Sequence, residues 1–122
     1  MIYRAAIAST DGKVVNQHFG RAEQFDIFDI SDDNSFKYVE RRAVSPCCHG
    51  GEHEAVAFSR VGNILNDVSA VIVSRIGEGA SEFLESNGFV VYEAPYPIEP
   101  LIQKIIKERL YEVDKWQYHT TS

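Results

Sequence analysis

The sequence predicts an α/β domain in which helices cover both faces of a mixed five-stranded sheet, a three-layer α/β/α arrangement. Three observations support this fold class. Two strand patterns joined by a short polar turn come early in the chain, later apolar runs alternate with helical patterns, and the element order is βββαβαβα. At 122 residues the chain has the usual size of one domain.

The first three predicted elements are strands. Residues 2–8 form a short apolar run that ends at the turn signal Ser9-Thr10-Asp11-Gly12. Residues 25–30 alternate in part, and the polar cluster at 31–35 turns the chain into a third strand at 36–42. This short turn predicts a hairpin, so the second and third strands are antiparallel neighbours.

The second half of the chain predicts helices that alternate with strands. Apolar residues recur at helical spacing over 54–66, and again from residue 78 to a stop at Asn87-Gly88. Residues 70–73 and 89–92 are short apolar runs, as expected of covered parallel strands. The clearest amphipathic pattern is the last one and predicts a helix over 98–110.

The composition argues against several classes of partner. It is 44% hydrophobic and 25% charged, as in an ordinary globular protein. A net charge of -6 disfavours nucleic acid and anionic membrane surfaces. No apolar run approaches the roughly 20 residues of a membrane span. We therefore expect a cytoplasmic protein with a single domain over 1–122, comprising a core at 1–110 and a C-terminal appendage at 111–122.

The predicted topology brings four loops to one edge of the sheet. If the first, fourth and fifth strands are parallel and the second is antiparallel to them, the third again runs parallel to the first. The segments after the first, third, fourth and fifth strands then leave at the same edge, where open α/β sheets bind ligands. The loops after the first and third strands start about 10 Å apart, so a ligand larger than a single ion could bridge them.

The segment after the third strand concentrates metal-ligating side chains. Residues 45–54 contain both cysteines, Cys47 and Cys48, together with His49 and His53. Thiolate and imidazole are typical ligands of transition metals. Because the chain has only two cysteines, four thiolates of one chain cannot hold a cluster. A bound cluster would be loosely held, exchangeable or shared across a dimer.

The loops after the first and fourth strands supply the other candidates. His18 offers an imidazole, Arg21 a compensating cation, and residues 77–80 offer backbone N–H groups at a helix start. An anionic metal-sulfur cluster requires a few such ligands, N–H donors to its sulfides and compensating charge.

Several motifs together resemble a known family. They are Asp11-Gly12, His18-Phe19-Gly20-Arg21-Ala22, Phe25 and Ile76-Gly77-Glu78-Gly79-Ala80, followed by the closing amphipathic helix. Over residues 1 to about 110 the chain resembles the dinitrogenase iron-molybdenum cofactor biosynthesis family. This family includes NifX-like and NafY-like nitrogenase accessory proteins, the C-terminal part of NifB and the molybdenum-copper orange protein.

The resemblance implies a ribonuclease H-like fold and non-covalent binding of a sulfide-bridged metal cluster. It also implies that His18 and the loop after the third strand line the cluster site. Many family members are rich in glycine and histidine in that loop, and Cys47-Cys48 departs from this pattern. The implied role is carriage or maturation rather than turnover, so we expect a non-enzymatic protein.

We therefore expect the chain to carry or store a metal-sulfur cluster of Fe-S, Fe-Mo or Mo-Cu type. Its expected partners are a cluster donor and a cluster acceptor, and we expect a monomer or weak dimer. The candidate cofactor-binding residues are His18, Phe19, Gly20, Arg21, Cys47, Cys48, His49, Gly77 and Gly79. The candidate metal ligands are Cys47, Cys48, His18, His49 and His53.

Other interpretations remain open at this level. The adjacent cysteines could form a strained disulfide and make the domain a redox or metal sensor that acts through protein contacts. A cysteine nucleophile is conceivable, but no substrate is specified. A two-metal nuclease is disfavoured because residues 2–8 contain no acidic side chain. His18 could simply cap a turn, and we expect Arg21 to form an internal ion pair with Asp11, Glu23 or Asp26.

Overall fold

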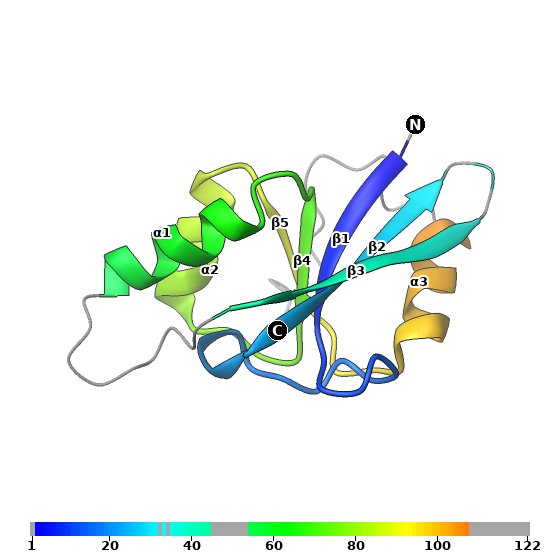
Figure 1. Cartoon of the computed structure of the whole chain (residues 1–122), viewed down its shortest axis with the longest axis horizontal. Helices are drawn as coiled ribbons and strands as arrows, with labels where there is room; N and C mark the ends of the chain where they lie inside the picture. The colour runs from blue at the N-terminus through cyan, green and yellow to red at the C-terminus, as the bar shows by residue number, and fades with distance from the viewer. Residues whose placement is uncertain (1, 32, 34, 45–53, 108–122) are drawn as a thin grey trace.

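The computed structural model describes residues 2–31, 33, 35–44 and 54–107 (Figure 1). The elements in chain order are β1 (Ile2–Ala8), the 3-10 turn η1 (Phe19–Arg21), β2 (Gln24–Ser31), β3 (Phe36–Ala43), α1 (Glu54–Ile64), β4 (Ala70–Val73), α2 (Glu78–Ser86), β5 (Val90–Glu93) and α3 (Ile98–Lys107). Every predicted strand and helix is present, and boundaries move by up to two residues, except that the last part of the predicted third helix lies outside the described residues.

The strand order across the sheet is β3-β2-β1-β4-β5. Strand β2 is antiparallel to both β1 and β3, whereas β1, β4 and β5 are parallel. The predicted strand directions are confirmed, and β1 and β3 flank β2 as expected. The carboxyl ends of four strands therefore lie at one edge of the sheet.

Helices cover both faces of this mixed sheet, with α1 and α2 on one face and α3 on the other (Figure 1). Successive residues of β1 point to opposite faces, so Ala6 and Ala8 belong to the α1/α2 core and Ala5 and Ile7 to the α3 core. None of the three helices in the described ranges is long and apolar enough to cross a membrane.

A β-bulge in β3 interrupts the regular alternation of its side chains between the two faces of the sheet. Ile27 of β2 pairs with Glu40, but the next residue, Phe28, pairs with Tyr38, so Val39 is the extra residue. Tyr38 packs edge-on against Phe28 on the α3 face, with ring centroids 5.5 Å apart. Val39 instead packs against the α1/α2 core. The bulge therefore changes which β3 side chains face each helix layer.

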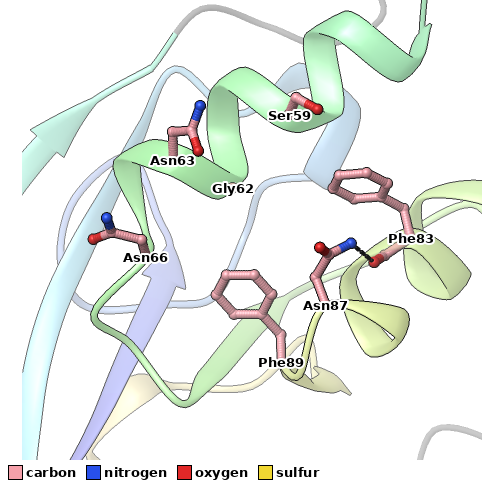
Figure 2. Close-up of a pocket in the computed structure, with 7 residues that line it drawn as sticks. All are labelled: Ser59, Gly62, Asn63, Asn66, Phe83, Asn87 and Phe89. Carbon is pink, nitrogen blue, oxygen red and sulfur yellow. Dashed lines mark hydrogen bonds between the residues drawn. The ribbon is translucent and has the colours of Figure 1, made fainter.

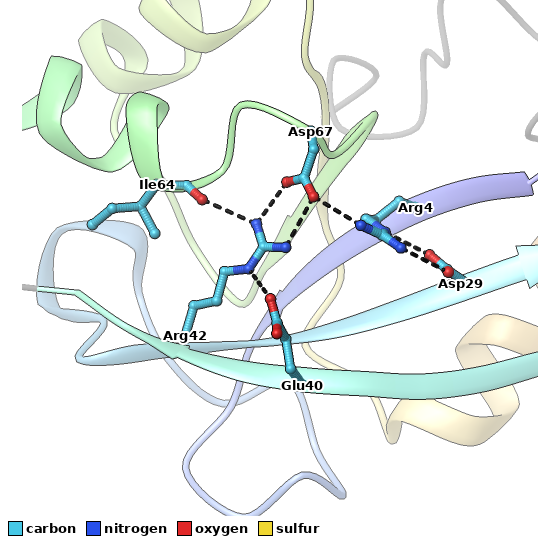
Figure 3. Close-up of polar contacts among 6 residues, drawn as sticks. All are labelled: Arg4, Asp29, Glu40, Arg42, Ile64 and Asp67. Carbon is cyan, nitrogen blue, oxygen red and sulfur yellow. Dashed lines mark hydrogen bonds and ion pairs between the residues drawn. The ribbon is translucent and has the colours of Figure 1, made fainter.

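An ion-pair network ties the sheet to the loop after α1 (Figure 3). Arg4 donates from Nε and Nη2 to the two carboxylate oxygens of Asp29, at 2.7 and 2.9 Å. It also donates from Nη1 to Asp67, at 2.8 Å. Arg42 donates to both oxygens of Asp67, at 2.6 and 2.9 Å, and to Glu40 at 2.6 Å. Three strands and one loop are thereby joined by charge-assisted hydrogen bonds.

The network also lowers the pKa values of its two aspartates. Arg42, and then Arg4, lower the pKa of the Asp67 carboxyl well below its usual range. The bond from Arg4 lowers the pKa of Asp29. A depressed carboxyl pKa stabilises the fold above the unfolded-state pKa, and this contribution is lost as the pH falls through the folded-state value.

We predict that Asp67→Asn lowers the free energy of unfolding by about 1 kcal/mol near neutral pH, because its side chain is partly exposed and solvent screens the ion pairs. The deficit shrinks below about pH 4, because the carboxyl of the unfolded wild-type chain takes up a proton there while the folded one is still ionised, and this favours unfolding of wild type. Urea denaturation near pH 7 and near pH 3 measures both effects. An equal deficit at the two pH values contradicts an ionic origin.

Candidate functional site

The long loop between β1 and β2 pairs with the chain that leaves β4. The Phe19 N–H donates to the Arg75 carbonyl at 2.9 Å, and the Ser74 N–H donates to the Gln17 carbonyl at 3.0 Å. His18 and Arg75 form an isolated parallel bridge. The bridge places His18 next to the segment that leads into α2, so two of the predicted site loops do lie together.

The same loop also contacts the turn that precedes α3. The Val15 N–H donates to the Tyr96 carbonyl at 3.0 Å, and the Ile98 N–H donates to the Lys13 carbonyl at 2.8 Å. At the beginning of the loop, Asp11 accepts the Lys13 N–H at 2.8 Å, and Gly12 adopts a left-handed φ of 73°. Three of the four loops predicted at this edge are therefore joined by backbone hydrogen bonds.

Phe19 anchors the loop in the core between the sheet and the α1/α2 layer. Its side chain is 2% exposed, and its ring lies 6.3 Å from Phe25 and 6.2 Å from Phe58, centroid to centroid. Among the candidate residues, Phe19 therefore has a structural role, because its buried side chain attaches the loop to the core. Its neighbour His18 is exposed at the N-cap of η1 and makes no side-chain capping hydrogen bond.

Arg21 is exposed, and the predicted internal ion pair was wrong. Asp26 is fully buried and binds Arg41, which donates from Nε at 2.8 Å. Arg41 lies directly opposite Asp26 in the β2–β3 register. Asp26 therefore pairs with Arg41 rather than with Arg21. Within the described part of the chain Arg21 forms no ion pair, so its charge is available to a ligand.

The start of α2 presents bare backbone. Gly77 is the N-cap, with φ -74° and ψ 158°, and a Cβ atom added at Gly77 or Gly79 would meet nothing within 4 Å. Neither φ nor crowding therefore requires glycine at these positions. The absence of side chains leaves the first-turn N–H groups accessible, although Glu78 adds an exposed carboxylate there.

Cys47, Cys48, His49 and His53 lie outside the described residues. The flanking residues are described: the Val44 N–H donates to the Glu23 carbonyl at 2.9 Å, directly after η1. On the other side, Phe58 of α1 packs on Phe19. Over the described ranges no group of three or more His, Cys, Asp or Glu side chains could hold a metal ion.

A separate groove of about 280 Å³ lies between α1 and α2 (Figure 2). It is lined by Ser59, Gly62, Asn63, Asn66, Phe83, Asn87 and Phe89. Asn87 Nδ2 donates to the Phe83 carbonyl at 2.8 Å at the end of α2. The groove contains no thiol, imidazole or charged lining residue, and none of the candidates predicted from the sequence.

Sequence reasoning did not identify Arg75 or Glu93. Arg75 is exposed beside His18, and the Glu93 carboxylate accepts the Ile76 N–H at 2.9 Å. Both residues follow predicted strands, which is a weak signal. The predicted topology already brings the segment after β4 to this edge, but the bridge between two loops distant in sequence is what shows that Arg75 lies next to His18.

Comparison with known proteins gives consistent matches. The family model for dinitrogenase iron-molybdenum cofactor matches residues 1–108. The FeMo cofactor biosynthesis protein NifB of Frankia alni is 35% identical over 106 residues, which cover 84% of this chain but only 20% of that protein. The chain therefore spans about a fifth of the length of this NifB protein.

Solved structures of similar size share the fold. The crystal structure of PH0822 has a TM-score of 0.65 and 30% sequence identity, covering 86% of this chain and 89% of that one. The NMR structure of a candidate NifB protein from Thermotoga has a TM-score of 0.54 and 27% identity, covering 87% and 88%.

We predict that Phe19→Ala lowers the free energy of unfolding by about 3 kcal/mol, because it leaves a cavity under the loop. The neighbouring change His18→Ala should alter it by less than about 0.5 kcal/mol, since this exposed side chain makes no capping bond. Urea denaturation of both variants measures the difference. A large loss in His18→Ala would assign the histidine a structural role.

Proposed function

The chain belongs to the dinitrogenase iron-molybdenum cofactor family, and on this premise we propose that it binds and carries or stores a metal-sulfur cluster during cofactor maturation. The cluster, of the iron-molybdenum cofactor or precursor type, is cargo that a donor protein supplies and an acceptor protein removes. In this proposal the protein is a non-catalytic carrier with a ribonuclease H-like fold, and its role is in iron-molybdenum cofactor biosynthesis.

The bridge between His18 and Arg75 is the observation that supports this proposal most. It holds an exposed imidazole beside the segment that leads into α2, whose first turn carries no side chain at Gly77 and Gly79. Imidazole is a ligand for iron and other transition metals, and helix N-terminal N–H groups attract anions. An anionic cluster can use both kinds of contact.

The chemistry of a carrier favours few ligands. A cluster enclosed by four protein thiolates is held firmly, whereas one or two protein ligands allow transfer to an acceptor. Hydrogen bonds from backbone N–H groups to the sulfides, together with the Arg21 cation, add affinity without further metal–ligand bonds. Such a site retains the cluster and still permits its release.

We assign the thiolate ligands to Cys47 and Cys48, with His49 and His53 as further imidazole candidates. Val44, three residues before Cys47, is bonded to the Glu23 carbonyl next to η1. Three residues span at most about 10 Å. The proposal therefore takes the cluster to be held between His18 and the segment that follows Val44, and a weak dimer could supply further thiolates.

Anaerobic reconstitution tests this function. We expect wild type to take up a visible chromophore with stoichiometric Fe, Mo or Cu by elemental analysis. Cys47→Ser, Cys48→Ser and His18→Ala should each weaken retention by about tenfold, because each removes a metal ligand. Asn63→Ala, in the groove between α1 and α2, is the control and should retain the cluster. A wild-type protein that takes up no chromophore or metal under any condition refutes the proposal.

The bare start of α2 gives a second test. We predict that Gly79→Ala leaves the fold intact and raises the free energy of unfolding by about 0.5 kcal/mol, since alanine is the better helix former. The added methyl group points toward the helix N-terminus and should weaken cluster retention. Urea denaturation and reconstitution measure the two effects. Unchanged retention would show that the cluster does not approach this turn.

A further inference from the structure

Arg75 projects from the loop edge beside His18. The two residues are direct partners in a parallel bridge, and residues paired in this way place their side chains on the same side, about 5 Å apart at the backbone. Both side chains are exposed. The guanidinium group and the imidazole therefore face the same solvent region, at the start of α2.

The backbone around Arg75 is fixed on both sides. Its carbonyl accepts the Phe19 N–H at 2.9 Å, and the next residue, Ile76, donates its N–H to Glu93 Oε2 at 2.9 Å. Phe19 is buried in the core. The base of the Arg75 side chain is thereby held in place, while its charged end remains exposed.

The charge of Arg75 is not neutralised by the described carboxylates. Glu78 and Glu93 lie near it in the fold, but neither forms an ion pair with it within the described ranges. By contrast, Arg4, Arg41 and Arg42 all bind aspartate or glutamate. Arginines that connect the strands are thus paired, whereas Arg75 at the loop edge is exposed and available.

Lys13 and Arg21 are also exposed on the loop between β1 and β2, and they too form no ion pair with a described residue. Three exposed cations without an ion-pair partner among the described residues therefore lie at this edge, in a protein whose net charge is -6. Asp11 and Glu23 lie on the same loop, Glu78 begins α2 and Glu93 ends β5, and these four carboxylates limit the net potential. An anion gains most where it contacts the guanidinium groups directly, because such hydrogen bonds are charge-assisted.

We propose that Arg75 is a specificity-determining residue that, together with Arg21, selects anionic metal-sulfur species over free divalent cations. This inference rests on the proposed carrier function and defines its substrate class as sulfide-bearing anions. The planar guanidinium donates N–H groups to the sulfides of the cargo while His18 reaches its metal. The same positive charge repels an unliganded metal cation.

The test uses tetrathiomolybdate, a metal-sulfur dianion, and Co²⁺, a free divalent cation, as separate probes. The full chain is titrated as wild type, Arg75→Gln, Arg75→Lys and Lys37→Gln. Lys37→Gln is the matched control, since it removes one exposed positive charge at the beginning of β3, far from the loop edge. Urea denaturation of each variant establishes that it is folded.

We expect Arg75→Gln to weaken tetrathiomolybdate binding about tenfold at low ionic strength, with a smaller difference at high salt. Co²⁺ binding should be equal or tighter. Arg75→Lys should retain most of the tetrathiomolybdate affinity, and Lys37→Gln should bind as wild type does. A merely structural role of Arg75 would weaken both probes alike and would show no dependence on salt.

The outcomes separate this inference from the proposed function. Equal tetrathiomolybdate binding by wild type and Arg75→Gln overturns the role of Arg75 while the carrier function stands. A wild type that takes up a cluster in reconstitution but does not bind tetrathiomolybdate overturns selection by charge. A wild type that takes up no cluster in reconstitution and does not bind tetrathiomolybdate overturns both the carrier function and the role of Arg75. If Arg75→Gln does not fold, Arg75→Ala takes its place as the variant that removes the charge, and tetrathiomolybdate binding by Arg75→Ala equal to that of wild type overturns the role of Arg75.

Discussion

The burial of Phe19 is the constraint on which the loop edge depends. Its ring lies in the core against Phe25 of β2 and Phe58 of α1. A large apolar side chain gains a few kcal/mol from such burial, enough to fix the conformation of a short 3-10 turn. With Phe19 turned inward, His18 and Arg21 on either side of it are exposed. The core thus determines which side chains of the loop a ligand can meet.

The strands and helices were predictable from the sequence because each one has its own local pattern of apolar residues. The covered strand β4 and the amphipathic helix α3 have apolar residues at the spacing of their own element. The bulge at Val39 was not predictable in this way, since it arises from the pairing of β3 with β2. It determines that Arg41 lies opposite Asp26 and Arg42 on the other face. The expected partner of Arg21 was wrong for that reason.

The candidate site was predictable only in part, for a similar reason. His18 and the glycines of α2 belong to short motifs that can be recognised along the chain. Arg75 and Glu93 have no such motif, and the contacts of Arg75 with His18 and of Glu93 with Ile76 join segments that are distant in sequence. Cross-loop backbone bonds leave no periodic signal in the residues that make them. The structure was therefore needed to bring Arg75 next to His18.

Some arginines of this protein are paired with carboxylates inside the fold, and others are exposed at the loop edge. This difference is consistent with the proposed site, which binds its cluster loosely. Arg4 and Arg42 use their hydrogen-bonding capacity to connect strands and loops, so they add little positive potential outside the fold. Arg21 and Arg75 have hydrogen-bonded backbone groups at the loop edge, and their side chains remain exposed. Their attraction for an anion weakens with salt and with competing partners, unlike a metal–thiolate bond. In the function that we propose, an acceptor protein that offers stronger ligands can then remove the cluster without unfolding the carrier.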